Sequence, residues 1–316
     1  MLRGVIAPHA MPVEIFFEQP DWVYRQGEGL SQSEAKEVLK SPAHWMARYG
    51  PGAEKLVPTP AMLLGTATHA RLLEPAIFDQ QFAAKSDTQD HTIAQLKELL
   101  EEAGTEYKKT AKKAELEALA FPDGKPEDKR TKLSDNDYAK ALGMAEAILN
   151  HPVAGPWFNP GLEGFRKFNE VSIRTQHVNG LLLKGRLDRV HREGDHISIL
   201  DLKTTADVSP RGFARQLVDR AYDLQVAWYL HLAEQAWPDC TVDFTFVCVE
   251  NGGKPHGVQV YRATPSVVQS GRRKMHHALD LYAQCKATEY WPGYDPKIID
   301  LEMPSWADFE VAEAVI

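Results

Sequence analysis

The sequence contains no long apolar run and few cysteines, and both absences narrow its function. No stretch approaches the roughly 20 apolar residues that a membrane-spanning helix needs. The 316 residues include three cysteines, Cys240, Cys248 and Cys285. An odd, scattered set disfavours a disulfide framework, a zinc knuckle and a four-cysteine iron–sulfur site. We therefore expect a protein of the reducing cytoplasm that does not associate with a membrane.

Positive charge is scarce as well. The chain has 36 Lys and Arg residues against 44 Asp and Glu residues, which gives a formal net charge of −8. This balance argues against a protein that coats nucleic acid non-specifically, although it leaves room for an enzyme with a local basic groove. The first residues, MLRGVIAPHAMP, are too short and too interrupted by proline for a secretory signal. The length suits one large globular domain or two modest ones.

Helical and strand patterns alternate along the chain without an internal repeat. Ser31 or Ser33 can cap a helix that runs to about Leu39, and Ser41-Pro42 can start another. Further helices are predicted at 61–74, within 92–120, and at 135–150, 210–218, 220–236 and 264–288. Strands are predicted at 165–175, 181–191, 196–203, 241–249 and 257–263. This order predicts an α/β fold with a helical N-terminal region and a central mixed sheet flanked by helices.

The stretch GRLDRVHREGDHISILDLKTT, residues 185–205, puts charged residues into strand patterns that are otherwise apolar. A hairpin turn near Gly194 places Asp188 opposite about residue 200, next to Asp201. Asp201 and Lys203 share a face because side chains alternate along a strand. A D-x-K triplet alone is expected about once by chance in a chain of this length. Here it follows the apolar ISIL, so we expect two carboxylates and one ammonium to converge at a sheet end.

Two helical pairs add candidates, each with an alternative. Gly65 and His69 lie four residues apart, so they share a helix face, and His69 could face the sheet. Gln225 and Tyr229 have the same spacing in YDLQVAWYLHLA. In isolation, His69 and Tyr229 are more simply interpreted as core side chains, and Gln225 as a residue at the rim.

In chain order, these pieces are GxxxH, a strand with Glu170 and Ser172, GRxD, DLKTT and QxxxY. The set resembles the PD-(D/E)xK nuclease superfamily, and most closely the RecE-type exonucleases (exonuclease VIII and phage relatives), a branch close to the RecB nuclease domain. The segments GLSQSEAKEVLKSPAHW, GTATHARLLEPAIF, WPGY and LEMPSWA also resemble that family, so the match covers nearly the whole chain.

The resemblance implies a single nuclease domain over residues 1–316. Residues 1–60 would form a helical segment at the DNA end, and residues 61–290 the PD-(D/E)xK core. A charged helical insertion would occupy about 85–130, where little of the family pattern is found, and 291–316 would be a C-terminal tail.

The chemistry of phosphodiester hydrolysis fits this set of residues. Mg²⁺, for which Mn²⁺ should substitute, prefers oxygen ligands and can activate a water near neutral pH. Asp188 and Asp201 are suitable ligands, and the Leu202 carbonyl is within geometric reach. In the family, a histidine at the position of His69 also contacts the metal.

The remaining candidates surround this centre. Lys203 could orient or deprotonate the attacking water, or stabilise the pentavalent phosphate. The resemblance implies that Gln225 and Tyr229 position the substrate strand and that Glu170 has a supporting role. A solvated strand glutamate is almost as good an interpretation of Glu170.

Candidate DNA contacts come from serines and arginines. Ser31, Ser33 and Ser41 are helix caps first, although hydroxyls and helix N-termini can also bind phosphate. The arginines that could follow the DNA backbone are Arg186, Arg189, Arg211 and Arg215.

The resemblance implies a Mg²⁺-dependent exonuclease that degrades linear duplex DNA, 5′ to 3′, and leaves a 3′ overhang. Its expected partners are a single-strand annealing protein of the RecT type and further copies of itself in a closed ring. Three alternatives stay open: an endonuclease of this fold, a related nuclease with a four-cysteine cluster, and a catalytically silent DNA-binding module. Three scattered cysteines argue against the second, and intact Asp188, Asp201 and Lys203 argue against the third.

Overall fold

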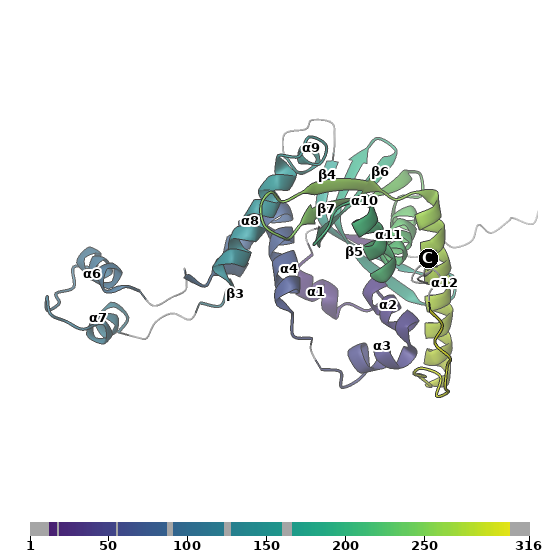
Figure 1. Ribbon diagram of the computed structural model, residues 1–316, viewed down its shortest axis with the longest axis horizontal. Helices are drawn as coiled ribbons and strands as arrows, with labels where there is room; N and C mark the ends of the chain where they lie inside the picture. Colours follow the sequence, from purple (N-terminus) through teal and green to yellow (C-terminus); the bar gives the residue numbers. More distant parts are fainter. Residues whose placement is uncertain are drawn as a thin grey trace, which may run out of the picture.

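A six-stranded mixed sheet forms the centre of the protein, and helices cover both of its faces (Figure 1). The structure, a computed structural model, describes residues 13–17, 19–54, 56–86, 91–122, 128–159 and 166–303. The strands lie in the order β1-β4-β5-β6-β7-β8, with bounds Val13–Phe16, Arg166–Gln176, Leu182–Glu193, His196–Thr205, Thr241–Glu250 and Val258–Arg262. The expected fold class is confirmed.

The sheet combines an antiparallel meander with one parallel pair. β4, β5 and β6 are antiparallel, and the β5–β6 hairpin turns at Gly194, whose φ of 56° is a conformation that glycine adopts without strain. β6 and β7 run parallel, so the chain needs a crossover between them. Two helices supply it, α10 (Pro210–Asp219) and α11 (Tyr222–Ala236).

Two apolar clusters divide the core between the faces of the sheet. On one face, α2 (Gln32–Lys40), α11 and α12 (Pro265–Thr288) pack together, with Trp228 and Phe244 fully buried between helix and sheet. The opposite face carries the second cluster, in which Met144 and Ile148 meet Leu202 and Val247. Its helices are α4 (Pro60–Leu73), α5 (Pro75–Gln81), α8 (Asp135–Leu149) and α9 (Gly155–Phe158).

The N-terminal helices are fastened to the segment that follows α12. These helices are α1 (Asp21–Gln26), α2 and α3 (Pro42–Tyr49). Trp45 of α3 stacks on Trp291, with ring centroids 4.4 Å apart, and the Ala43 N–H donates to the Pro292 carbonyl at 3.0 Å. The WPGY segment therefore braces α3.

A pair of helices stands away from the sheet (Figure 1). α6 (Ile93–Glu102) and α7 (Lys113–Ala120) pack on each other through a small apolar cluster of Leu96, Leu100 and Leu116. At the base of the pair, β2 (Phe82–Ala84) and β3 (Thr131–Leu133) form a separate parallel ribbon. The charged segment expected within 92–120 is thus two helices with a small core of their own.

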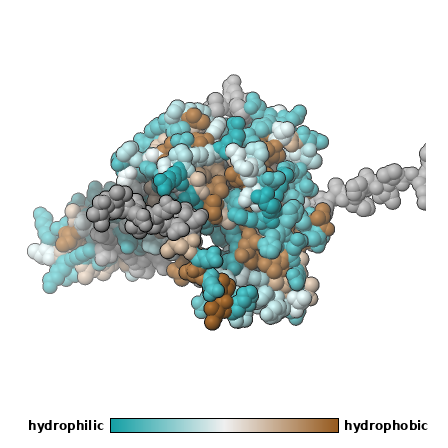
Figure 2. Space-filling model, turned by 45° about the vertical axis from the view of Figure 1, so that its right-hand side comes forward, coloured by the Kyte–Doolittle hydropathy of each residue, from teal (hydrophilic) through white to brown (hydrophobic). Residues whose placement is uncertain are grey.

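The surface agrees with the absence of long apolar runs from the sequence. Figure 2 shows a largely hydrophilic face, interrupted by smaller groups of hydrophobic side chains. Within the described ranges, no helix combines the length and the apolar character that crossing a membrane requires.

Candidate active site

The β5–β6 ladder ends beside the two aspartates. Its last pair is Arg189 and Leu200, so Asp188 and Asp201 are the next positions to face each other. The register inferred from the sequence is correct to within one residue. In place of a ladder bond, Asp188 Oδ2 accepts a hydrogen bond from the Leu202 N–H at 2.9 Å. Asp188 therefore lies where the two strands separate.

The strands next to this opening are irregular at the same level. Glu170 on β4 has a φ of 50°, a left-handed conformation that is costly for a residue other than glycine. Phe168 and Val171 both pack against one apolar cluster, although a spacing of three should put them on opposite faces. Leu187 and Val190 on β5 do the same. Irregular strand positions often re-aim side chains beside active sites.

Three side chains from three elements converge at this irregularity. His69 of α4, Glu170 of β4 and Asp188 of β5 each offer a ligand atom, and these atoms all lie within 4.8 Å of one another. His69 Nδ1 is 3.5 Å from Asp188 Oδ2, and its Nε2 is 3.1 Å from the Leu202 carbonyl oxygen. Within the described residues, this is the group of histidine, cysteine or carboxylate side chains that could hold a metal ion.

The donor set fits a divalent cation. Two carboxylates and one imidazole are ligands that suit magnesium, manganese or a similar ion. Burial, followed by the neighbouring charge of Asp188, raises the pKa of Glu170 to about 8, while Arg186 opposes the rise. Like charges crowded in a half-buried position would be relieved by a cation. The structure thus brings Glu170, expected only to support the site, into the ligand group itself.

Asp201 lies behind this group and has other partners. Its carboxylate is fully buried, accepts a hydrogen bond from Gln225 Nε2 at 2.6 Å and forms an ion pair with Lys203. Burial raises the pKa of Asp201, whereas the ammonium of Lys203 opposes that rise. The expected convergence of Asp188, Asp201 and Lys203 is present, but the metal-ligand role of Asp201 stays a prediction.

A second lysine approaches the centre, and sequence reasoning missed it. Two ammonium groups lie over the ring of Tyr222, with Lys203 Nζ 5.0 Å and Lys36 Nζ 5.2 Å from its centroid. Lys36 comes from α2, far away in the chain. Burial, followed by the charge of Lys203, lowers the pKa of Lys36 to about 7. Helix spacing could have predicted that Tyr222 lies near the site, since it precedes Gln225 by three residues and shares its helix face.

Tyr229 belongs to the core in this structure. It is 6% exposed and packs over Gly185, where an added Cβ would lie 3.1 Å from the Tyr229 ring. Burial raises the pKa of Tyr229 well above its ordinary value. Of the expected Gln225–Tyr229 pair, only Gln225 contacts a charged residue of the site, and Tyr222 is the ring beside Lys203.

A family model matches residues 31–299, and its description is a PDDEXK-like domain of unknown function (DUF3799). The chain belongs to this family. No curated protein sequence matches the chain. The family assignment agrees with the superfamily expected from the motifs and does not by itself specify a substrate.

Solved structures support the fold of this PDDEXK-like domain. A crystal structure of a putative exonuclease from Eubacterium rectale superposes with a TM-score of 0.55 at 13% identity, covering 92% of this chain and 97% of that one. A second structure, of a protein from Vibrio cholerae, gives a TM-score of 0.23 at 10% identity, covering 87% of this chain and 58% of that one. The first similarity shows a shared fold, and the second carries no argument.

The four arginines expected to follow DNA are placed differently in the PDDEXK-like domain. Arg186 Nε is 2.6 Å from Glu170, and another of its nitrogens is 3.0 Å from Asp21, so it orders the ligand group. Arg189 is 6% exposed, donates to Asn169 at 2.6 Å and lies over the Phe158 ring. The DNA contact expected of Arg189 stays a prediction, and the structure places this side chain among buried partners. The exposed pair on α10 is Arg211 and Arg215.

The three serines divide between capping and exposure. Ser31 caps α2 in a reciprocal pair with Glu34, and Ser41 caps α3 and is bonded to His44 Nδ1 at 2.6 Å. Ser41 is also buried. Ser33 is exposed, and its hydroxyl accepts a bond from Gln32 at 3.0 Å. The interpretation as caps holds for Ser31 and Ser41, and Ser33 has its hydroxyl at the surface.

Proposed function

We propose that this protein is a Mg²⁺-dependent DNA exonuclease that hydrolyses linear duplex DNA. One observation carries the proposal: His69, Glu170 and Asp188 form a ligand group beside the Asp201–Lys203 ion pair, in a domain of the PDDEXK-like family. The Eubacterium rectale protein of the same fold is named as a putative exonuclease, which adds support for this reaction class.

Different residues would bind the metal, orient the attacking water and position the catalytic side chains. His69, Glu170 and Asp188 would hold the cation, and Asp201 and the Leu202 carbonyl are further oxygen donors beside it. Bound Mg²⁺ would neutralise charge on the phosphate and lower the pKa of a coordinated water. Lys203 can orient that water or stabilise the charge that develops on the phosphate. Gln225 fixes the Asp201 carboxylate, which in turn positions Lys203.

The finer assignment rests on the resemblance to RecE-type exonucleases. We infer 5′-to-3′ degradation that leaves a 3′ overhang for strand-annealing recombination in the cytoplasm, with a RecT-like annealing protein as partner. A closed ring of several copies would direct the basic surface inward and the acidic remainder outward, which favours free ends. A phage or prophage origin fits this role.

The deciding experiment uses linear duplexes labelled at either the 5′ or the 3′ end, together with covalently closed circular duplex. In Mg²⁺, linear DNA should be shortened from the 5′ end, circles should persist, and EDTA should stop the reaction. Circles cut as fast as linear DNA would favour the endonuclease. DNA binding without metal-dependent cleavage would favour the silent binding module instead.

A further inference from the structure

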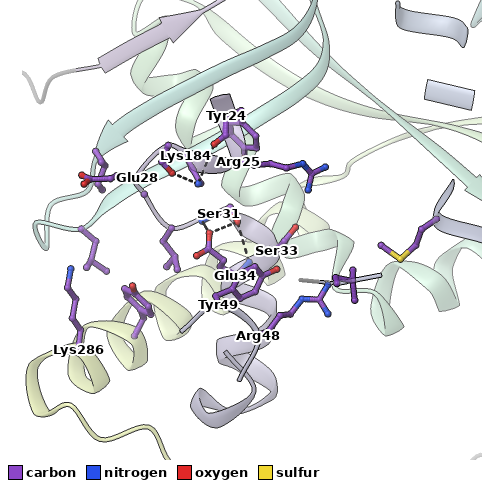
Figure 3. A pocket seen from close by; sticks show the side chains of 18 residues that line it. Tyr24, Arg25, Glu28, Ser31, Ser33, Glu34, Arg48, Tyr49, Lys184 and Lys286 are labelled. Carbon is purple, nitrogen blue, oxygen red and sulfur yellow. Dashed lines mark hydrogen bonds between the residues drawn. The ribbon is translucent and has the colours of Figure 1, made fainter. Parts of the chain in front are cut away.

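A cleft of about 850 Å³ lies beside the active site, between the N-terminal helices, the start of β5 and the end of α12 (Figure 3). Its lining carries more positive than negative charge, although the whole chain is acidic. The charged residues of the lining are Arg25, Arg48, Lys184, Lys286, Glu28 and Glu34. The motifs discussed above assign no function to this cleft beyond a DNA-end role for its serines.

Two of the four cations are available to a ligand. Lys184 is 8% exposed and donates to the Gly27 carbonyl, and Arg25 pairs with Asp21 at 2.5 Å. Arg48 has a distant carboxylate partner, Glu37 at 3.9 Å, and its guanidinium lies 5.7 Å from the centroid of the Tyr49 ring, so its remaining N–H groups are open to a ligand. Lys286 is exposed and forms no hydrogen bond or ion pair with the described residues. Figure 3 shows Arg48 and Lys286 toward opposite ends of the cleft.

An exposed aromatic ring lies between these cations. Tyr49 lines the cleft, is 38% exposed and packs on Trp45. Figure 3 shows Tyr49 in the central part of the cleft. Basic groups that alternate with exposed aromatic rings are the combination with which proteins hold single-stranded nucleic acid.

The cleft and the ligand group share structural elements. On α1, Tyr24 and Arg25 line the cleft, and Asp21 holds Arg186, which contacts Glu170. On α2, Ser31 lines the cleft, and Lys36 reaches the Tyr222 ring beside Lys203.

The distance between the two sites can be estimated along β5. Lys184 lines the cleft, and Asp188 belongs to the ligand group four residues later. Four strand residues span about 13 Å. This length equals about four nucleotide steps along a B-form strand, at roughly 3.4 Å each.

We infer that the cleft binds a few nucleotides of one DNA strand, in continuity with the strand that is cut. The inference rests on the proposed function, because it assumes that the strand bound in the cleft continues into the active site, where it is cut. Arg48 and Lys286 would contact phosphates, and Tyr49 would stack on a base. The volume falls in the range of sites for drug-sized ligands, roughly 300–1,000 Å³, which is the size class of a few nucleotides.

The first test measures binding of a fluorescent twelve-nucleotide oligothymidylate in EDTA, which prevents cleavage. Arg48→Ala with Lys286→Ala should weaken binding about tenfold or more and reduce the salt slope by roughly 1.4, or 0.7 for each lost phosphate contact. The control is Arg272→Ala with Arg273→Ala, which removes the same charge from α12 outside the cleft lining. Equal affinities for the two double variants would overturn the inference.

Tyr49→Ala tests the stacking contact separately. Loss of one stacked base should weaken oligothymidylate binding roughly 5- to 150-fold with the salt slope unchanged, since no charge is removed. Thermal unfolding of the variant shows whether its fold persists, and Tyr49→Phe should restore binding because it keeps the ring. If Tyr49→Phe binds as poorly as Tyr49→Ala, the ring is not a stacking platform.

The second test uses duplexes with single-stranded overhangs of zero to ten nucleotides. The wild-type KM should fall with overhang length until about four nucleotides and then level off, whereas the Arg48→Ala, Lys286→Ala variant should lose this dependence with kcat little changed. A length dependence that persists in the variant would contradict the inference alone. Absence of any cleavage by the wild type would refute the proposed function, and oligothymidylate binding would still report on the cleft.

Discussion

The β5–β6 hairpin and the cleft beside it are built in opposite ways. In the hairpin, charged side chains are buried and bonded to one another, as Asp201 is to Lys203 and Gln225. In the cleft, Arg48 and Lys286 are exposed, and Arg48 is held only by a 3.9 Å ion pair with Glu37 and by contact with the Tyr49 ring. Burial and mutual bonding fix a geometry, which cleavage requires, whereas exposed cations adapt to a flexible strand. We therefore expect mutations in the hairpin to change the rate of cleavage, and mutations in the cleft to change affinity.

Among the hairpin mutations, Asp188→Asn should lower the rate of cleavage most. The variant removes a charged metal ligand, so we expect the cleavage rate to fall roughly 10³-fold or more. The unfolding temperature in EDTA should stay level or rise, because Asp188 adds to the repulsion at Glu170. End-labelled duplex and thermal unfolding measure the two quantities.

A matched control for this change lies in the same hairpin. Asp195 is exposed in the turn, so Asp195→Asn removes one carboxylate without touching the ligand group. Asp195→Asn should cleave like the wild type. If both variants lost cleavage activity to a similar degree, Asp188 would act through the overall charge of the hairpin and not as a metal ligand.

Lys203→Ala should be the next largest change. If Lys203 acts on the water or the phosphate, the rate should fall roughly 10²-fold while DNA binding persists. Single-turnover kinetics at saturating DNA separate the rate from affinity. If the rate stayed within a few-fold of the wild type while DNA binding weakened, Lys203 would contribute to affinity, as the cleft cations do, and not to cleavage.

Lys36→Met should have the smallest effect and tests whether α2 contributes to the centre. Losing a cation beside Lys203 should lower kcat/KM about tenfold, and replacing a partly buried ammonium by an apolar chain should raise the unfolding temperature. A purely structural residue would instead lower both stability and activity. The control is Lys40→Met on the exposed side of the same helix, which should change neither quantity.

The sequence predicted the hairpin because local rules govern it. The turn at Gly194 sets the register, the register pairs Asp188 with Asp201, and alternation adds Lys203. Helix spacing made His69 and Gln225 candidates, and the family resemblance gave them a role at the site. The strand, helix and sheet predictions from 135 to 288 agree with the structure to within about two residues at most boundaries, because those elements are long and strongly patterned.

Other placements depend on geometry that has no local signal. Glu170, in a left-handed conformation, belongs to the ligand group, and Arg189 is buried beside Asn169; neither placement can be read from alternation. Lys36 reaches the centre only because α2 packs on α11, a tertiary contact between distant segments. The strands β1, β2 and β3 were missed because they have three or four residues each.

The stacking of Trp45 on Trp291 has a consequence for synthesis of the protein on the ribosome. Every candidate catalytic side chain lies before residue 237, whereas the cleft needs Lys286, at the end of α12, and an α3 braced by the segment after it. A domain generally folds as a unit, and α12 packs on α11, the helix that carries Gln225. A nascent chain can therefore complete neither its hydrolytic centre nor its cleft until its last helix has left the ribosome.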